Sequence, residues 1–525
     1  MIEQATTIFL FLKDYSGNGS DRYFLYKNQI LSEVSVSELV AAQGLIVCHD
    51  YWLIAPSIYS AAGILPRCVV DLDEFSAGTI CTREGRKQRD RKGVPEALAD
   101  TSEAREIAKK YSEIFYRTSE YDAEIFTQTA EYIFKYWITL GKNAFENDEL
   151  ARQFFVEIPV FNLLYQQIVS GIFIDAVVLR EHKSQIDHQY YSFLKTFSSK
   201  HDLPLEVPND HSVIEYLEPQ GFDFSGISVD YVLKFLPTRN NFASDILTLR
   251  KLDASRSVLA ALPLSQRRTI PIIDLFGSIT SRIYFKDPVL QNLAKRHRNV
   301  IAASPGKILS YIDYDQFEVG IMAALSMDPE MLRLYESNDI YQVLSADIFQ
   351  GDQKRKVAKR LFLSYAYGMK TKSLVDAAVE QGADRRKVKD FFAKFVVFES
   401  WKREVLCRFE ADGKIGPGFG NFQKREQIGP LTEKEKRAGV SQVVQGTASL
   451  IFKKALLKLR DESDVRILIP MHDAVLIEHM PEYDPNRIIS IFSKTMTDHL
   501  EQRVIGKASL ESFYSTQEEL LPLRQ

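Results

Sequence analysis

Two apolar runs that lie far apart in the chain each lead to an aspartate, and this pair constrains the fold more than any other feature. Residues 308–312 end directly before Asp313, and residues 465–469 end shortly before Asp473. Short runs of this kind, rich in β-branched residues, are typical of buried strands. A carboxylate beside a buried strand is costly unless it is paired, and a divalent metal ion is the usual partner. If the fold brings the two aspartates together, they can hold two metal ions for in-line phosphoryl transfer.

A basic segment between the two runs adds a cationic surface. Four of its residues recur at every fourth position and share one face if the segment is a helix. They are Arg355, Lys359, Leu363 and Tyr367. Arginine forks onto phosphate oxygens, and lysine supplies a compact positive charge. Two carboxylates beside such a helix outline a site for nucleotidyl transfer.

The three segments, taken in order, resemble the three signature motifs of family A DNA polymerases. The first motif reads Asp-Tyr-Ser-Gln-Ile-Glu in the family and spans residues 313–318 here. Asp315 replaces the serine and Phe317 replaces the isoleucine. The third motif, His-Asp-Glu, is matched by His472 and Asp473. The second is matched by the basic segment, at Arg355, Lys359, Tyr367 and Gly368.

Shorter matches carry the resemblance from about residue 155 to the C-terminus. They lie at residues 157–159, 171–175, 280–282, 287–292, 339–341 and 445–448. The resemblance implies a right-hand polymerase fold. Its parts would be a thumb at 151–264, a palm at 265–328 and 446–525, and fingers at 329–445.

The resemblance also implies roles for individual residues. Asp313 and Asp473 would be the metal ligands, with the backbone carbonyl of Tyr314 as a further oxygen ligand. They would hold two Mg²⁺ ions, for which Mn²⁺ can substitute, and Lys359 would join them as a catalytic residue. The incoming nucleotide would be bound by Gln316, Glu318, Tyr341, Arg355, Lys359, Leu363 and Tyr367. Primer–template DNA would be contacted by Arg282, Gln291, Asn292, Arg437, Gln445 and His472.

Glu318 bears on the choice of sugar. In the family this glutamate packs beneath the sugar of the incoming nucleotide, where a 2′-hydroxyl would collide with it. Single-subunit RNA polymerases lack it in the equivalent motif, so its presence favours deoxynucleotides. An RNA polymerase of that type is the alternative enzyme, and a catalytically silent DNA-binding replication subunit is the alternative from another class. The second alternative is opposed by the joint retention of Asp313, Asp473, Arg355 and Lys359.

Several positions depart from the family pattern. Leu363 replaces an aromatic residue that stacks near the nucleotide, so the nucleotide should be positioned more loosely. Gly320 stands where the family generally has arginine, and Tyr341 where it has histidine. Ala474 removes the glutamate of the third motif. These changes spare every charge that the two-metal scheme needs, which indicates a divergent enzyme such as that of a phage or plasmid.

Residues 1–150 predict a separate α/β unit, because strand-like runs come first and long helical stretches follow. In family A polymerases the neighbouring domain is a 3′–5′ exonuclease of ribonuclease-H-like fold, and this unit resembles a worn version of it. Lys13, Ile54 and Thr118 stand where that chemistry needs metal ligands or their partner. We therefore expect a scaffold domain without proofreading activity. Its remaining acidic candidates are Asp14, Asp50 and Asp122.

Composition narrows the class of protein. Of the 525 residues 45% are hydrophobic and 26% charged, as in ordinary globular proteins. No apolar run approaches the about 18 residues of a membrane span, and the four cysteines lack the Cys-x-x-Cys spacing of zinc sites. The net charge of −4 means that DNA must be met by local positive charge.

From these features we expect a multidomain chain that combines α/β and α+β units and acts as a monomer. Its partners would be primer–template DNA and dNTPs, with no membrane partner. The expected location is the cytoplasm of a bacterium or of an infected host. Whether replication or processivity factors also bind is left open by the sequence.

Overall fold

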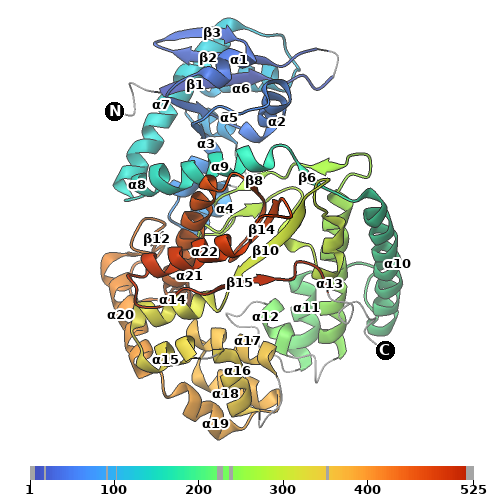
Figure 1. Ribbon diagram of the computed structural model, residues 1–525, viewed down its shortest axis with the longest axis vertical. Coiled ribbons are helices and arrows are strands. Elements are labelled where there is room, and N and C mark those ends of the chain that lie inside the picture. The colour runs from blue at the N-terminus through green and yellow to red at the C-terminus, as the bar shows by residue number, and fades with distance from the viewer. Residues whose placement is uncertain are drawn as a thin grey trace.

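The N-terminal part of the chain forms a five-stranded mixed sheet with helices packed around it (Figure 1). The computed structural model describes residues 6–16, 19–89, 93–101, 103–220, 229–235, 241–337, 339–349 and 354–515. The strand order is β3-β2-β1-β4-β5, with β1 antiparallel to β2 and parallel to β4. Every residue of β1 is buried, as expected for a central strand that is covered on both faces.

The elements of this unit follow the predicted order of strands first and long helices last, so the α/β prediction is confirmed. The strands are β1 (Thr6–Leu12), β2 (Arg22–Lys27), β3 (Ile30–Val34), β4 (Leu45–Cys48) and β5 (Val69–Asp71). The helices are α1 (Val36–Ala41), α2 (Tyr51–Ala62), α3 (Leu72–Thr79), α4 (Arg83–Arg89), α5 (Val94–Ala99), α6 (Arg105–Phe115) and α7 (Ala123–Glu146).

A mainly helical region follows, and its two long helices α10 and α13 form an antiparallel pair (Figure 1). Lys183 near the start of α10 donates to the carbonyl of Leu262 just after α13, at 2.6 Å. Lys200 near the end of α10 meets Asp245 near the start of α13, at 2.7 Å. The elements are α8 (Leu150–Arg152), the π-helical η1 (Gln153–Glu157), α9 (Ile158–Ile168), β6 (Ile172–Phe173), α10 (Ala176–His201), α11 (Asp210–Leu217), η2 (Glu218–Gln220), α12 (Val229–Phe235) and α13 (Asn241–Ala261).

The centre of the molecule is a four-stranded antiparallel sheet in the order β13-β14-β10-β15. Along β10, Ser310, Ile312 and Tyr314 are buried, while the alternate residues Tyr311 and Asp313 are more open. Because strand side chains alternate between faces, the first set faces the protein core and the second faces the opposite side. On the core side the Tyr314 hydroxyl donates to the carbonyl of Phe492 in α22, at 3.0 Å.

The bounds of this central region come from two parts of the chain. The first part holds β7 (Arg268–Thr269), β8 (Ile273–Asp274), β9 (Tyr284–Phe285), η3 (Leu290–Asn292), η4 (Lys295–Val300) and β10 (Ile308–Tyr314). The second holds α21 (Glu433–Lys458), η5 (Leu459–Asp461), β13 (Val465–Met471), β14 (Ala474–His479), α22 (Asn486–His499) and β15 (Ala508–Glu511).

Between these two parts lies a helical insertion at the end of the molecule farthest from the N-terminal sheet (Figure 1). Phe362 and Tyr365 of α17 pack with Phe392 and Phe395, with Tyr365 and Phe392 ring centroids 4.5 Å apart. This aromatic core leaves the polar face of α17 directed away from it. The elements are α14 (Phe317–Ser326), α15 (Pro329–Ser337), α16 (Ile340–Ile348), α17 (Arg355–Ala366), α18 (Thr371–Glu380), α19 (Arg385–Phe392), α20 (Val396–Asp412), β11 (Lys414–Ile415) and β12 (Gln423–Lys424).

No helix among the described ranges is both long enough and apolar enough to cross a lipid bilayer.

Candidate active site

The fold brings the two predicted aspartates together at one end of the central sheet. The register of β10 against β14 sets Asp313 opposite Ala474, and Asp473 is the residue before Ala474 in the tight turn between β13 and β14. The amide of Tyr314 donates to the carbonyl of Asp473 at 3.1 Å, which ties the two strand ends together. His472 takes a positive φ of 50°, so the turn reverses within two residues.

The electrostatics of this pair leave a carboxylate without compensation. Burial, and then the charge of Asp473, raise the pKa of Asp313, while Lys359 opposes the shift. Burial also raises the pKa of Asp473, against Lys359 and Arg282. The Oδ1 atom of Asp313 is buried and accepts no hydrogen bond. A buried carboxylate oxygen without a donor suits a cation, so the residues present fit a divalent metal ion.

The protein supplies few further ligands to such an ion. Within the described ranges, no group of three or more His, Cys, Asp or Glu side chains is arranged to hold a metal. Asp315 turns away to accept a hydrogen bond from the Ser509 hydroxyl, at 2.7 Å. A metal bound by Asp313 and Asp473 would therefore complete its shell with backbone, solvent or substrate oxygens.

Glu318 lies beside the aspartates and links three separate segments of the chain. Its Oε1 accepts from the Arg282 guanidinium at 2.7 Å, and its Oε2 accepts from the Tyr367 hydroxyl at 2.6 Å. Burial raises the pKa of Tyr367, with Glu318 adding to the shift and the hydrogen-bonded side chain of Gln445 opposing it. Tyr367 therefore stays a neutral donor. The carboxylate of Glu318 is fixed from both sides in front of the sheet.

The predicted cationic helix is α17, and its charges stand over a buried ring. The guanidinium of Arg355 lies 5.5 Å and the ammonium of Lys359 5.7 Å from the centroid of the Tyr341 ring. Arg355 also pairs with Asp339, the N-cap of α16, through its Nε at 2.7 Å. Lys359 is exposed, and Leu363 is half-buried one turn further on. The buried ring of Tyr341 thus packs beneath the two cations, and its contact with the nucleotide stays a prediction.

Gln316 has a structural connection inside the protein. It follows β10 with a positive φ of 51°, and its Oε1 accepts from the amide of Ile340 at 2.9 Å. This bond ties the turn after Asp313 to the start of α16. The backbone position of Gln316 is therefore set by both the sheet and the helical insertion.

The predicted DNA contacts divide into two groups. Asn292 is exposed, and Arg282, Arg437, Gln445 and His472 are half-buried. The ring of His472 packs on Tyr284 at 4.8 Å, and burial with Arg282 lowers its pKa to about 4, so it is neutral near pH 7.

Gln291 departs from this group. Its side chain is buried, its amide nitrogen donates to the carbonyl of Pro470 at 2.9 Å, and its Oε1 accepts from the amide of Phe285 at 2.8 Å. The Gln291 side chain thus links two backbone segments, and its contact with DNA stays a prediction. It lies in an irregular stretch, where sequence position does not tell which way a side chain points.

Packing explains why residue 320 is a glycine where the family generally has arginine. A Cβ atom added to Gly320 would lie 2.7 Å from Cζ of Tyr335 and 2.5 Å from Cε of Met496. The space that a side chain would need at this position is filled by those two residues. The glycine therefore accommodates the packing of Tyr335 and Met496 in the core, and the position of Glu318 is not affected.

In the N-terminal unit the acidic candidates do not converge. Asp14 accepts from the backbone of its own loop, at Ser16 and Gly19. Asp122 caps α7, and Ile54 is part of the hydrophobic core. Asp50 is bound by its neighbours His49 and Trp52, and Lys13 donates to Ser57. Within the residues that the structure describes, the metal-binding set of an exonuclease is not assembled.

Known proteins that are similar to this chain are DNA polymerases. The sequence model described as DNA polymerase family A matches residues 219–512, more than half of the chain. DNA polymerase I of Chloroflexus aurantiacus is 24% identical over 362 residues, which are 62% of this chain and 38% of that protein. DNA polymerase theta of Caenorhabditis elegans is 32% identical over 214 residues, 38% of this chain and 13% of that protein. The chain therefore spans well under half the length of these curated relatives.

A solved structure extends the likeness to the whole fold. It is the POL domain of Pol1 from M. smegmatis in complex with DNA primer-template and dNTP. The TM-score is 0.71 at 18% identity, over 93% of this chain and 91% of that chain. At this coverage the superposition must include most of the N-terminal unit as well as the region after it. The chain belongs to DNA polymerase family A.

Proposed function

We propose that this protein is a template-directed DNA polymerase that adds deoxynucleotides to a primer 3′ end and does not proofread. The observation that carries the proposal is the meeting of Asp313 and Asp473, with an unpartnered carboxylate oxygen, beside the cationic helix α17. The proposed parts are a thumb at 151–264, a palm at 265–328 and 446–525, and fingers at 329–445. Primer–template DNA and dNTPs are carried over as ligands from the M. smegmatis complex.

Asp313, Asp473 and the carbonyl of Tyr314 would hold two Mg²⁺ ions, for which Mn²⁺ can substitute. Bound there, the ions supply the Lewis acidity that activates a hydroxyl nucleophile and neutralises a departing pyrophosphate. Lys359 is exposed and would meet the triphosphate as a point charge. Arg355 is paired with Asp339. The N–H groups of its guanidinium that do not take part in this pair would face the same phosphates.

Glu318 would select the sugar. Its carboxylate is held by Arg282 and Tyr367, so it cannot swing aside to admit a 2′-hydroxyl without breaking two short hydrogen bonds. Arg437, Gln445, His472 and Asn292 would contact the duplex. Contacts in the minor groove check the shape of a base pair without reading its sequence, because acceptors there are nearly common to all pairs.

Two other functions are weaker. A single-subunit RNA polymerase is disfavoured by the fixed carboxylate of Glu318, and a silent DNA-binding subunit by the uncompensated carboxylate of Asp313. We further propose that the protein acts as a monomer in the cytoplasm. Other replication partners are left open.

Primer extension tests the function. A labelled primer–template is incubated with dNTPs or rNTPs, with and without Mg²⁺. We expect template-complementary extension by dNTPs that requires Mg²⁺ and little extension by rNTPs. Efficient extension by rNTPs would favour the RNA polymerase, and no extension with intact DNA binding would favour the silent subunit.

A further inference from the structure

A fully buried ion cluster lies beneath the segment that carries Arg282. Arg152, Glu157 and Lys453 have exposed fractions of 1%, 1% and 0%. The Glu157 carboxylate accepts from Arg152 Nε at 2.7 Å and from Lys453 Nζ at 2.6 Å. Arg152 and Glu157 come from the consecutive elements α8 and η1, whereas Lys453 of α21 lies 296 positions after Glu157. Charges removed from water in this way persist only if every donor and acceptor is used.

Both cations of the cluster also donate to Ser281. Its hydroxyl oxygen receives hydrogen bonds from Arg152 Nη2 at 2.7 Å and from Lys453 Nζ at 3.3 Å. Its carbonyl accepts from the Ser449 hydroxyl at 2.5 Å. Ser281 is fully buried and has a positive φ of 54°, a conformation that non-glycine residues rarely adopt. The surrounding bonds hold it there.

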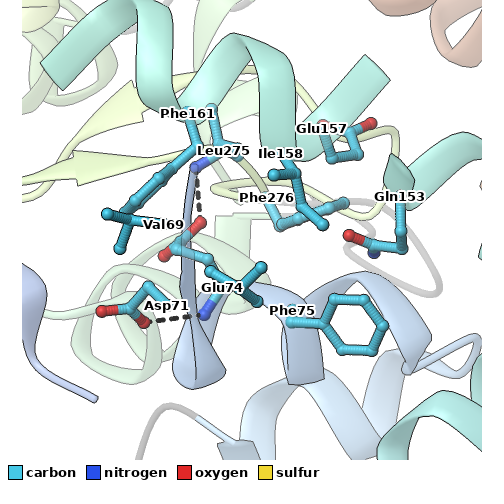
Figure 2. A pocket seen from close by; sticks show the side chains of 11 residues that line it. Val69, Asp71, Glu74, Phe75, Gln153, Glu157, Ile158, Phe161, Leu275 and Phe276 are labelled. Carbon is cyan, nitrogen blue, oxygen red and sulfur yellow. Dashed lines mark hydrogen bonds between the residues drawn. The ribbon is translucent and has the colours of Figure 1, made fainter. Parts of the chain in front are cut away.

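The residues just before Ser281 are held by the N-terminal unit as well. Leu275 is bonded on both sides: its amide donates to Glu74 of α3 at 2.8 Å (Figure 2), and its carbonyl accepts from Lys453 at 2.9 Å. Arg86 of α4 donates to the carbonyls of Phe276 and Ser278, at 3.2 and 3.1 Å. The cavity left at this junction measures about 10 Å³, which is room for a single water and no ligand.

The held segment ends at the sugar-selecting group. Arg282 follows Ser281 directly and donates to Glu318 at 2.7 Å, and Glu318 accepts from Tyr367. A displacement of residue 281 therefore moves the guanidinium that fixes Glu318. Misplacement by about 1 Å far from the chemistry can change a rate by about a hundred-fold, so a cluster of this kind can act on selectivity.

We propose that Glu157, Lys453 and Ser281 are positioning residues for sugar selection, which they control by holding Arg282 against Glu318. The inference rests on the proposed polymerase function. The hydroxyl of Ser281 receives hydrogen bonds from both buried cations, so the link from the cluster to residue 281 runs through this side chain.

The test compares two isosteric changes of buried, ion-paired glutamates. Glu157→Gln removes the charge that organises the cluster. Glu478→Gln is the matched control, because Glu478 is 1% exposed, accepts from Ser304 at 2.5 Å, and lies at the end of β14 away from Asp473. The readout is the ratio of kcat/KM for dNTP to that for rNTP, together with the KM for dNTP.

We expect Glu157→Gln to lower the dNTP preference about ten-fold and to raise the KM for dNTP, since about 1 Å of misplacement suffices for such a change. Glu478→Gln should keep the wild-type ratio within about two-fold, because additivity predicts no coupling between distant sites. Ser281→Gly is the second variant. Glycine tolerates the positive φ and lacks the hydroxymethyl group whose hydroxyl receives the two cations, so the variant should fold and shift the ratio in the same direction by about three-fold.

The outcomes separate this inference from the proposed function. If Glu157→Gln and Ser281→Gly both keep the wild-type ratio while Glu318→Ala lowers it, the positioning role is wrong. The same conclusion follows if Glu157→Gln does not fold and Ser281→Gly alone keeps that ratio. If the wild-type protein fails to extend primers with dNTPs, the proposed function itself is wrong.

Discussion

Aspartates stand at the ends of buried strands in both the N-terminal unit and the central sheet, and their surroundings differ. Asp71 at the end of β5 accepts from three backbone amides, those of Tyr51, Asp73 and Glu74, at 2.8, 2.9 and 3.2 Å. Asp313 at the end of β10 keeps a buried oxygen that accepts nothing. A strand-end carboxylate is therefore available for a metal only where the backbone around it has not used its oxygens.

The same difference separates the other carboxylates of the two regions. In the N-terminal unit the carboxylates of Asp14 and Asp122 accept hydrogen bonds from backbone amides of their own turns, so each stabilises its local backbone. In the central sheet Asp473 sits in a turn whose geometry brings it to Asp313, and burial together with the charge of Asp473 raises the pKa of Asp313. This difference supports the proposal that the first region is a scaffold and that the metal site lies in the second.

The largest predicted effect follows from removing one carboxylate of the central pair. Asp313→Ala or Asp473→Ala should lower the single-turnover extension rate by about a thousand-fold or more, because metal-assisted chemistry loses a ligand. Primer–template affinity should stay within a few-fold, since phosphate contacts are spread over many basic residues. Asp71→Asn is the matched change in the other region and should leave the rate per folded molecule intact. Near-normal extension by either alanine variant would remove the metal assignment.

Glu318→Ala should produce the second largest effect, on selectivity. The incorporation of rNTP relative to dNTP should rise about ten-fold or more, because an obstacle that hydrogen-bonds and fills space near the 2′-position is lost. Glu330→Ala is the control, since Glu330 pairs with Arg333 on the surface of α15. Competition between labelled rNTP and dNTP measures the ratio. An unchanged ratio in an active variant would mean that selection lies elsewhere.

A smaller gain is expected at Leu363, where α17 lacks the family's aromatic residue. Leu363→Tyr should lower the KM for dNTP about three-fold to ten-fold, because a base stacked on an aromatic ring gains about 1–3 kcal/mol where the stack is complete. Leu363→Met keeps the size without the ring and should change little. Steady-state kinetics on one template give both values. If the methionine variant improves as much as the tyrosine variant, stacking is not the reason.

The smallest effects are expected from the N-terminal carboxylates. Asp122→Ala removes the N-cap of α7, which accepts from the amides of Glu124 and Ile125 at 2.8 and 3.2 Å. It should lower the free energy of unfolding by about 1 kcal/mol and leave the extension rate unchanged within error. Thermal unfolding and single-turnover extension measure the two quantities. A loss of extension without a loss of stability would give this carboxylate a function that the comparison denies.

The sequence predicts much of this comparison because its signals are local. The β-branched runs indicate β10 and β13, and the four-residue recurrence of Arg355, Lys359 and Leu363 indicates one face of α17. The resemblance to the family predicts that these segments form one site.

Other features depend on contacts between residues far apart in the chain. Lys453 sits in an apolar stretch of α21, and only its contact with Glu157, 296 positions away, explains its burial. Gln291 and Tyr341 match family positions, yet tertiary packing turns both side chains into the protein. Spacing in the sequence does not predict which way such a side chain points, because its orientation depends on how the neighbouring side chains pack around it.

One measurement tests the central claim, that chemistry belongs to the central sheet and not to the N-terminal unit. A primer with a mismatched 3′ end, labelled at its 5′ end, is incubated with Mg²⁺ in the presence and absence of dNTPs. We predict that the wild-type protein lengthens a fraction of the primers when dNTPs are present and leaves every primer intact when they are absent. The Asp313→Ala, Asp473→Ala double variant should leave every primer intact both with and without dNTPs. Shortening that persists in the double variant and disappears on changing Asp14, Asp50 or Asp122 would contradict the account.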